Sequence, residues 1–347
     1  MGRGKLGIQE QRERVLQPEE EKPRSGFSVL VTATSTWILL VLLVIIAIFS
    51  ALDFEAFASV FNFRNISIDA SGLLIISVGM TFVIITSGID LSVGAVLVFA
   101  SVVGAIVMRN IGGEGLGIML VGLVSALLAG VAWGLLNGFL IAKTRIPALI
   151  VTLGTLGMAQ GSALLLTEGI NVREVPTALT TTVGVGRLFG TIPYLVLIAA
   201  VITVLGVIVL HFTRFGRYTY AIGSNAEASR RAGINVSRHL ISVYAISGLL
   251  AGLAGYLSLA RFATTTIEGH ATDNLQAIAA VVIGGTSLFG GIGRIGGTVV
   301  GVFIPATLQN GFIILGFQPF WQQVAVGAVL VLAVYVDQLK RQARERE

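Results

Sequence analysis

The sequence predicts an all-α integral membrane protein of about ten transmembrane helices, from its composition, its long uncharged runs and the placement of its basic residues. Of the 347 residues, 54% are hydrophobic and 12% are charged. Soluble domains carry about 25% charged residues. The mean hydropathy of +0.89 indicates the same deficit. No stretch of the sequence is polar enough to form the water-facing surface of soluble domains. The helices are therefore expected to face lipid.

Uncharged runs are the units from which the spans are counted. A helix crosses the ~30 Å hydrocarbon core with ~20 residues, and a charge at mid-membrane costs ~2.5–3.5 kcal/mol. The last run is twice the needed length, and Gly316, Gln318 and Pro319 divide it into two helices. Ten spans are thus predicted from nine runs, at 25–52, 70–89, 91–108, 115–142, 146–167, 188–213, 239–260, 274–293 and 295–336.

The placement of basic residues predicts that both termini lie in the cytoplasm. With ten spans and a cytoplasmic N-terminus, 18 of the 23 Lys and Arg fall on inner segments. The charged first residues lack the apolar core of a secretory signal. We therefore predict a disordered cytoplasmic tail over 1–28, a transmembrane domain over 29–337 and a second cytoplasmic tail over 338–347.

Two series of glycines at four-residue spacing predict close helix packing. The chain has 43 glycines, and each costs ~1 kcal/mol against alanine inside a helix. In lipid, small residues on one helix face let two backbones approach closely. Such glycine faces either serve only in helix packing, or they are also surfaces along which the helices slide during transport. The two series are Gly130, Gly134 and Gly138 in the fourth span and Gly293, Gly297 and Gly301 in the ninth.

Several kinds of chemistry are missing from the sequence. The chain has no cysteine, which excludes disulfides and thiolate metal sites. The three histidines fall at span ends or in loops, so no catalytic residue and no metal site is predicted. Gly291, Gly293 and Gly296 match a dinucleotide fingerprint, but no strand precedes them, and no G-x-x-x-x-G-K-[ST] motif occurs. We expect no cofactor on this chain. Its basic residues form no dense stripe, so nucleic acid is not an expected partner.

Polar side chains within the spans are the candidates for a solute path. Asp90 lies between two apolar runs, in a serine- and glycine-rich break over residues 87–94, where freed backbone groups can line a cavity. It either caps the third span or contacts the solute or a partner. The uncharged residues either bind a hydroxyl-rich solute or bond neighbouring helices. The candidates are Asp90, Ser92, Asn137, Gln160 and Asn310.

The longest inner loop, residues 214–238, predicts a docking element. Asn225 is a plausible N-cap, residues 226–232 a short helix and Gly233 its C-terminal stop. A solvated surface turn is the alternative. Proton-driven carriers usually keep carboxylates or histidines inside their helices. Apart from Asp90, this chain has none there, so the energy for transport is expected to come from another subunit.

Four segments resemble ribose-type sugar permeases, the membrane subunits of ATP-binding-cassette importers. They are residues 87–94, 134–142, 221–234 and 283–297, and the resemblance extends over about 35–337. It implies that 29–337 is a permease domain with a cytoplasmic coupling loop at 214–238. The loop departs from many importers by reading Glu-Ala-Ser where they have Glu-Ala-Ala. The coupling residues implied are Gly223, Asn225, Glu227, Ala228, Arg230, Arg231 and Gly233.

The resemblance also implies the partners. These are a cytoplasmic ATPase that binds ATP and Mg²⁺, an extracytoplasmic solute-binding protein, and a second copy of the chain or a paralogous permease. The chain itself is then no enzyme, and it lies in the bacterial cytoplasmic membrane. The expected solute is a ribose-like monosaccharide. A branched-chain amino acid, a nucleoside or a signalling furanose is the nearest alternative, and an ion-coupled carrier or an intramembrane enzyme is a more distant one.

Overall fold

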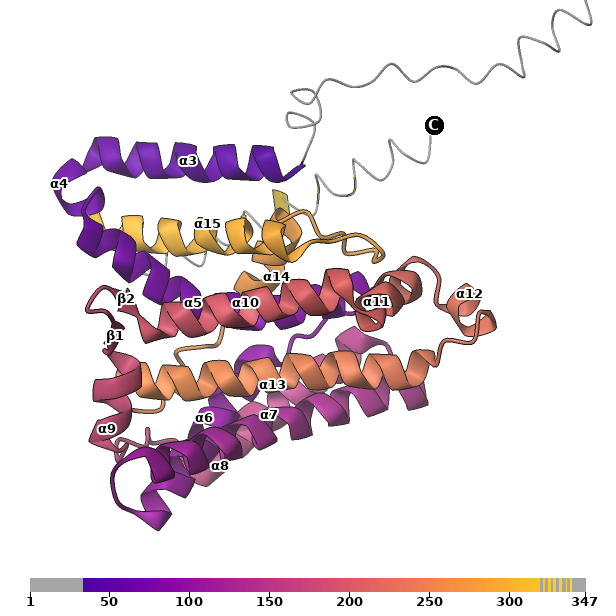
Figure 1. The fold of residues 1–347 in the computed structure, drawn as a ribbon, viewed down its shortest axis with the longest axis horizontal. Helices are drawn as coiled ribbons and strands as arrows, with labels where there is room; N and C mark the ends of the chain where they lie inside the picture. Colours follow the sequence, from indigo (N-terminus) through magenta and orange to yellow (C-terminus); the bar gives the residue numbers. More distant parts are fainter. Residues whose placement is uncertain are drawn as a thin grey trace, which may run out of the picture.

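The computed structural model describes residues 34–318 and scattered positions between 321 and 338 (Figure 1). Within this part the chain is almost wholly helical, and its one strand pair is the short antiparallel β1–β2 hairpin. The elements are α3 (Thr34–Leu52), α4 (Phe54–Phe57), α5 (Val60–Ile85), α6 (Val93–Ile111), α7 (Leu116–Thr144), α8 (Ala148–Thr167), α9 (Thr177–Leu179), the π-helix η1 (Thr180–Gly184), β1 (Arg187–Leu188), β2 (Ile192–Pro193), α10 (Tyr194–Phe212), α11 (Arg214–Ser224), α12 (Ala226–Arg231), α13 (Val236–Phe262), α14 (Asp273–Ile283) and α15 (Ile295–Ile314).

The prediction of an all-helical membrane protein is confirmed. Among the described residues, seven helices are long and apolar enough to span a bilayer: α5, α6, α7, α8, α10, α13 and α15. The apolar part of α3 (Trp37–Leu52) and α14 are shorter. The tail over 1–28 lies outside the described residues, and the tenth predicted span and the tail from 338 lie largely outside them.

The predicted span over 274–293 is not one helix. α14 ends at Ile283, and a glycine-rich segment, residues 284–294, connects it to α15. Gly285, Gly290 and Gly291 have φ of +89°, +84° and +73°, a left-handed conformation that glycine adopts without steric cost. An uncharged run therefore does not guarantee a continuous helix where glycines cluster.

α5 forms the centre of the bundle. In its most apolar stretch 83% of the residues are buried, against 22–28% for α7, α8 and α10. The outer helices expose large apolar side chains instead, among them Leu128, Leu165 and Val204, as expected where a helix faces lipid. In Figure 1, α11 and α12 lie at one end of the bundle, and α4, α9 and the β1–β2 hairpin lie at the other.

The first glycine series packs α7 against α13. A Cβ added at Gly130 would overlap the carbonyl oxygen of Gly248, one at Gly134 would overlap that of Tyr244, and one at Gly138 would lie 2.7 Å from the Cα of Ile241. These two backbones are therefore in direct contact.

The second series is correct only in part. Gly297 and Gly301 of α15 lie against the carbonyl oxygens of Gly284 and Ala280. Gly293, however, precedes α15 and belongs to the 284–294 segment, because the backbone does not become helical until Ile295.

Candidate functional site

Loop 214–238 contains two helices rather than one. After α11, Asn225 is the N-cap of α12, and its side-chain oxygen accepts a hydrogen bond from the backbone N–H of Ala228 at 2.8 Å. Beyond the helix, Gly233 has a φ of +87°, and its N–H donates to the carbonyl of Arg230 at 3.0 Å. The short helix thus lies where the capping pattern places it. Figure 1 shows α12 projecting beyond the end of the bundle.

The outer face of α12 is charged and exposed. Glu227 pairs with Arg230 at 3.0 Å and with Arg231 at 3.4 Å, and the three side chains are 58–80% exposed. Exposed pairs of this kind contribute only ~0.2–1 kcal/mol. Ala228 is also exposed, whereas Ser229 is buried and its hydroxyl donates to the Asn225 carbonyl. The helix is anchored on one side and presents both signs of charge on the other.

Three segments meet where α11 ends, at what we call the junction: residues 85–88, 220–224 and 287–293. The Ser87 hydroxyl donates to the carbonyl of Phe289 (2.8 Å) and, at longer range, to that of Gly223 (3.2 Å). The N–H of Gly291 donates to the carbonyl of Ile85 at 2.9 Å. The end of α5, the end of α11 and the segment before α15 are therefore linked by direct hydrogen bonds.

Tyr220 and Gly223 tighten the junction. The Tyr220 hydroxyl donates to the Gly293 carbonyl at 2.7 Å. Burial raises the pKa of the Tyr220 phenol, so it remains a donor. A Cβ at Gly223 would overlap the Ile85 carbonyl oxygen and lie 2.6 Å from the Gly291 nitrogen. Sequence reasoning found Gly223 but not its partners, because they come from distant parts of the chain.

Three of the five solute-path candidates are brought together in a buried polar network. Asp90 accepts hydrogen bonds from the Ser92 N–H (3.0 Å) and hydroxyl (2.6 Å), and from the Ser247 hydroxyl (3.0 Å). Asn137 donates to the Ser92 hydroxyl oxygen at 2.8 Å and accepts from Thr155 at 2.7 Å. Asp90, Ser92 and Asn137 are 2%, 0% and 1% exposed, so the network is closed to a solute in this conformation.

Asp90 does not cap α6. The N-cap of that helix is Ser92, whose own side chain makes no capping hydrogen bond. The Asp90 carboxylate instead ties the 86–92 break to α13 through Ser247, and Asn137 extends the network to α7 and α8. A role for these residues as solute contacts stays a prediction.

The other two candidates lie apart from the network. The Gln160 side-chain amide donates to the carbonyl of Ile267 at 3.1 Å and so positions the loop between α13 and α14. The side-chain oxygen of Asn310 is buried and has no hydrogen-bond partner among the described residues. That these two residues contact the solute also remains a prediction.

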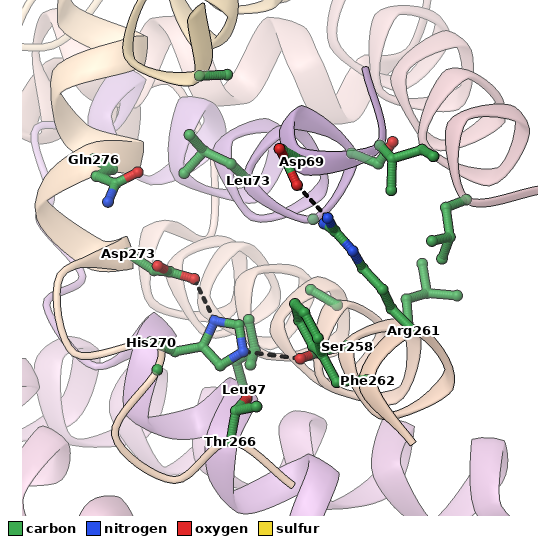
Figure 2. A pocket seen from close by; sticks show the side chains of 18 of the residues that line it. Asp69, Leu73, Leu97, Ser258, Arg261, Phe262, Thr266, His270, Asp273 and Gln276 are labelled. Atoms are coloured by element: carbon green, nitrogen blue, oxygen red, sulfur yellow. Dashed lines mark hydrogen bonds and ion pairs between the residues drawn. The ribbon is translucent and has the colours of Figure 1, made fainter. Parts of the chain in front are cut away.

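A cavity of about 250 Å³ lies between α5, α13, α14 and α15 (Figure 2). Figure 2 shows Arg261 and Asp69 pointing toward one another, and they form an ion pair. His270 lies between Asp273 and Ser258, with its Nδ1 2.7 Å from the Asp273 carboxylate and its Nε2 2.9 Å from the Ser258 hydroxyl.

Sequence reasoning missed this cavity. None of the five solute-path candidates lines it, and Asp69 and Arg261 are 192 positions apart in the chain. Within the described part of the chain, no group of three His, Asp or Glu is arranged to hold a metal ion. In the sequence, Asp69 and Arg261 stand out only as charges at the edges of apolar runs. Ordinary residues at the membrane interface show the same pattern.

Comparisons with known proteins agree with the motif resemblance. Residues 62–334 match the family described as branched-chain amino acid transport system / permease component. The ribose import permease protein of Escherichia coli K12 is 40% identical over 316 residues, 89% of this chain and 96% of that protein. The D-allose transport system permease protein of E. coli K12 is 33% identical over 331 residues (94% and 98%). The fructose import permease protein of Rhizobium meliloti is 34% identical over 307 residues (86% and 84%). No solved structure gives a significant match.

Proposed function

We propose that this chain, which belongs to the branched-chain amino acid transport permease family, is the membrane subunit of an ATP-driven importer of a ribose-like monosaccharide. Relatives named for ribose, allose and fructose support the sugar. The family's own description keeps a branched-chain amino acid as the second candidate. The chain is a multi-pass protein of the bacterial inner membrane.

The observation that carries the proposal is α12, a capped and exposed helix at one end of the bundle. It docks in the cytoplasmic ATPase, where ATP and Mg²⁺ bind. ATP-driven movement of the ATPase shifts α11 and α12 as a rigid unit. The junction passes this shift to α5 and to the segment before α15 through the bonds of Ser87, Tyr220 and Gly291. No covalent bond changes in this chain.

The complete assembly has further partners. An extracytoplasmic binding protein delivers the sugar, and a second copy of the chain, or a paralogue, completes the pore. Seven spans, together with α3, α14 and the segment after Pro319, make ten. The fraction of Lys and Arg on inner segments, 18 of 23, supports cytoplasmic termini.

The proposed orientation predicts the outcome of cysteine labelling. The chain has no native cysteine, and Thr177 and Ser224 are both exposed. In intact cells, Thr177→Cys should react with a membrane-impermeant maleimide, and Ser224→Cys should react only after the cells are permeabilised. Labelling of Ser224→Cys in intact cells would reverse the orientation.

Charge reversal at Glu227 tests the docking role of α12. Glu227→Arg places three cations on one exposed face and repels a basic surface that Glu227 otherwise contacts. We expect the ATPase to be lost on co-purification and sugar uptake to fall about ten-fold or more, as a loss of ~1.4 kcal/mol of binding gives.

The matched control for Glu227 is Glu55→Arg, an exposed site on α4 at the opposite end of the bundle. This variant should retain the ATPase. Normal uptake and normal co-purification for Glu227→Arg would remove the support for α12 as the docking element. An ion-coupled carrier would then be the better description.

A further inference from the structure

We propose that the cavity between α5, α13, α14 and α15 is a transit site for one neutral, polyhydroxylated solute. The inference rests on the proposed function and adds to it a place in the chain where a monosaccharide binds during import. The residues that line the cavity belong to one copy of the chain.

The size of the cavity fits one small solute. Its volume of about 250 Å³ is many times the ~10–15 Å³ that a single water needs. Concave sites with a few convergent polar groups are the usual form of small-molecule sites. The lining here combines apolar side chains such as Leu73, Leu97 and Phe262 with nine polar ones, from Asp69 to Gln309.

The arginine of the cavity already has a partner. Arg261 forms an ion pair with Asp69, and His270 is hydrogen-bonded to Asp273. A zwitterionic amino acid needs a free cation for its carboxylate, because a buried charge without a partner is costly. Arg261 is already bonded to Asp69, so the lining favours a neutral solute over an amino acid.

Hydrogen-bonding capacity nevertheless remains. The Gln309 amide lines the cavity without a side-chain hydrogen bond to any described residue. Gln276 uses only its nitrogen, on Thr272 at 3.2 Å, and keeps its oxygen. Asp69 and Asp273 each keep one carboxylate oxygen. Donors and acceptors placed side by side match a ring of hydroxyl groups, each of which donates and accepts.

The position of the cavity suits delivery from outside the cell. Arg261 lies at the end of α13 remote from α12, and Thr266 and His270 belong to the loop that follows. That loop is held by Gln160 at the Ile267 carbonyl and by Asn171 at the Ile267 N–H (3.1 Å each). Gln160 therefore acts on the site by positioning its wall.

Protection from thiol labelling tests the proposal in the full chain. In membrane vesicles, Thr266→Cys should react with a small maleimide, and D-ribose should slow the reaction. A transit site must release its solute, so weak binding is expected. With a Kd of about 10 mM, about 100 mM D-ribose slows labelling roughly ten-fold. L-leucine at the same concentration should have no effect. The control is Glu268→Cys, exposed on the same loop and outside the lining, which D-ribose should not protect.

A second variant separates binding from folding. Gln309→Leu breaks no side-chain hydrogen bond of the described structure, so the protein should reach the membrane in normal amount. In the Thr266→Cys background it should abolish protection by D-ribose, and alone it should lower sugar uptake by cells that carry the intact importer.

The outcomes distinguish this inference from the proposed function. If D-ribose gives no protection and Gln309→Leu imports sugar normally, the cavity is not a transit site, although ATP-driven sugar import stands. If L-leucine protects and D-ribose does not, both the inference and the sugar assignment are wrong.

Discussion

Replacing Gly134 by leucine should abolish the folded protein. A Cβ at Gly134 would overlap the carbonyl oxygen of Tyr244 and lie 3.0 Å from the Cα of Ala245. Backbone atoms inside a helix cannot move aside as a flexible side chain can, so α7 and α13 must separate. Overpacking typically costs 1–3 kcal/mol, and we expect about 3 kcal/mol here. The measurement is the yield of monodisperse protein in mild detergent, together with its thermal unfolding.

Gly154→Leu is the matched control for Gly134. It lies in α8, and a Cβ there meets nothing within 4 Å. The added side chain faces open space, and leucine has a better helix propensity than glycine. Yield and thermal unfolding should match the wild type. If Gly134→Leu also gave the wild-type yield, the close approach of α7 and α13 would be contradicted.

Replacing Gly223 by alanine should stop transport and leave the ATPase attached. The added methyl group would overlap the Ile85 carbonyl oxygen and approach the Gly291 nitrogen at 2.6 Å. α11 must then withdraw from α5, which breaks the hydrogen bond from Ser87. The exposed face of α12 is unchanged, so docking persists. We expect uptake to fall about ten-fold or more, since a clash of 1–3 kcal/mol opposes the junction.

Gly296→Ala controls for the change of glycine to alanine near the junction. It lies in the first turn of α15, and a Cβ there meets nothing within 4 Å. It should import sugar at the wild-type rate. The two variants are compared by uptake, by co-purification of the ATPase and by stimulation of ATP hydrolysis by loaded binding protein. If Gly223→Ala kept normal stimulation, the junction would not transmit the movement.

The spans were predictable because exclusion of charge from lipid is a local property of the sequence. It placed α5 through α8, α10, α13 and α15. It failed at 284–293, an uncharged segment that is not helical because its left-handed glycines form a turn. Absence of charge shows that a segment tolerates burial, but it does not show that the backbone is helical.

The two candidate sites, α12 and the cavity, also differ in whether their residues lie close together in the sequence. The limits of α12 were predictable because Asn225 and Gly233 act on amides within a few residues. The cavity was not, because its ion pair joins residues from α5 and α13. Of the two alternatives for Asp90, the cap is not the arrangement observed: its carboxylate accepts from the N–H and hydroxyl of Ser92 and from the Ser247 hydroxyl, and Ser247 is distant in the sequence. Pairings across the bundle depend on helix order, which a single sequence does not contain.

Reconstituted transport tests the central claim most directly. Purified permease is placed in proteoliposomes with its ATPase, ATP is enclosed inside, and binding protein loaded with D-ribose, D-allose or D-fructose is added outside. We expect one of these sugars to accumulate against its gradient only when permease, ATPase, ATP and binding protein are all present. Accumulation of sugar by the permease alone, driven by a proton or sodium gradient, would contradict it.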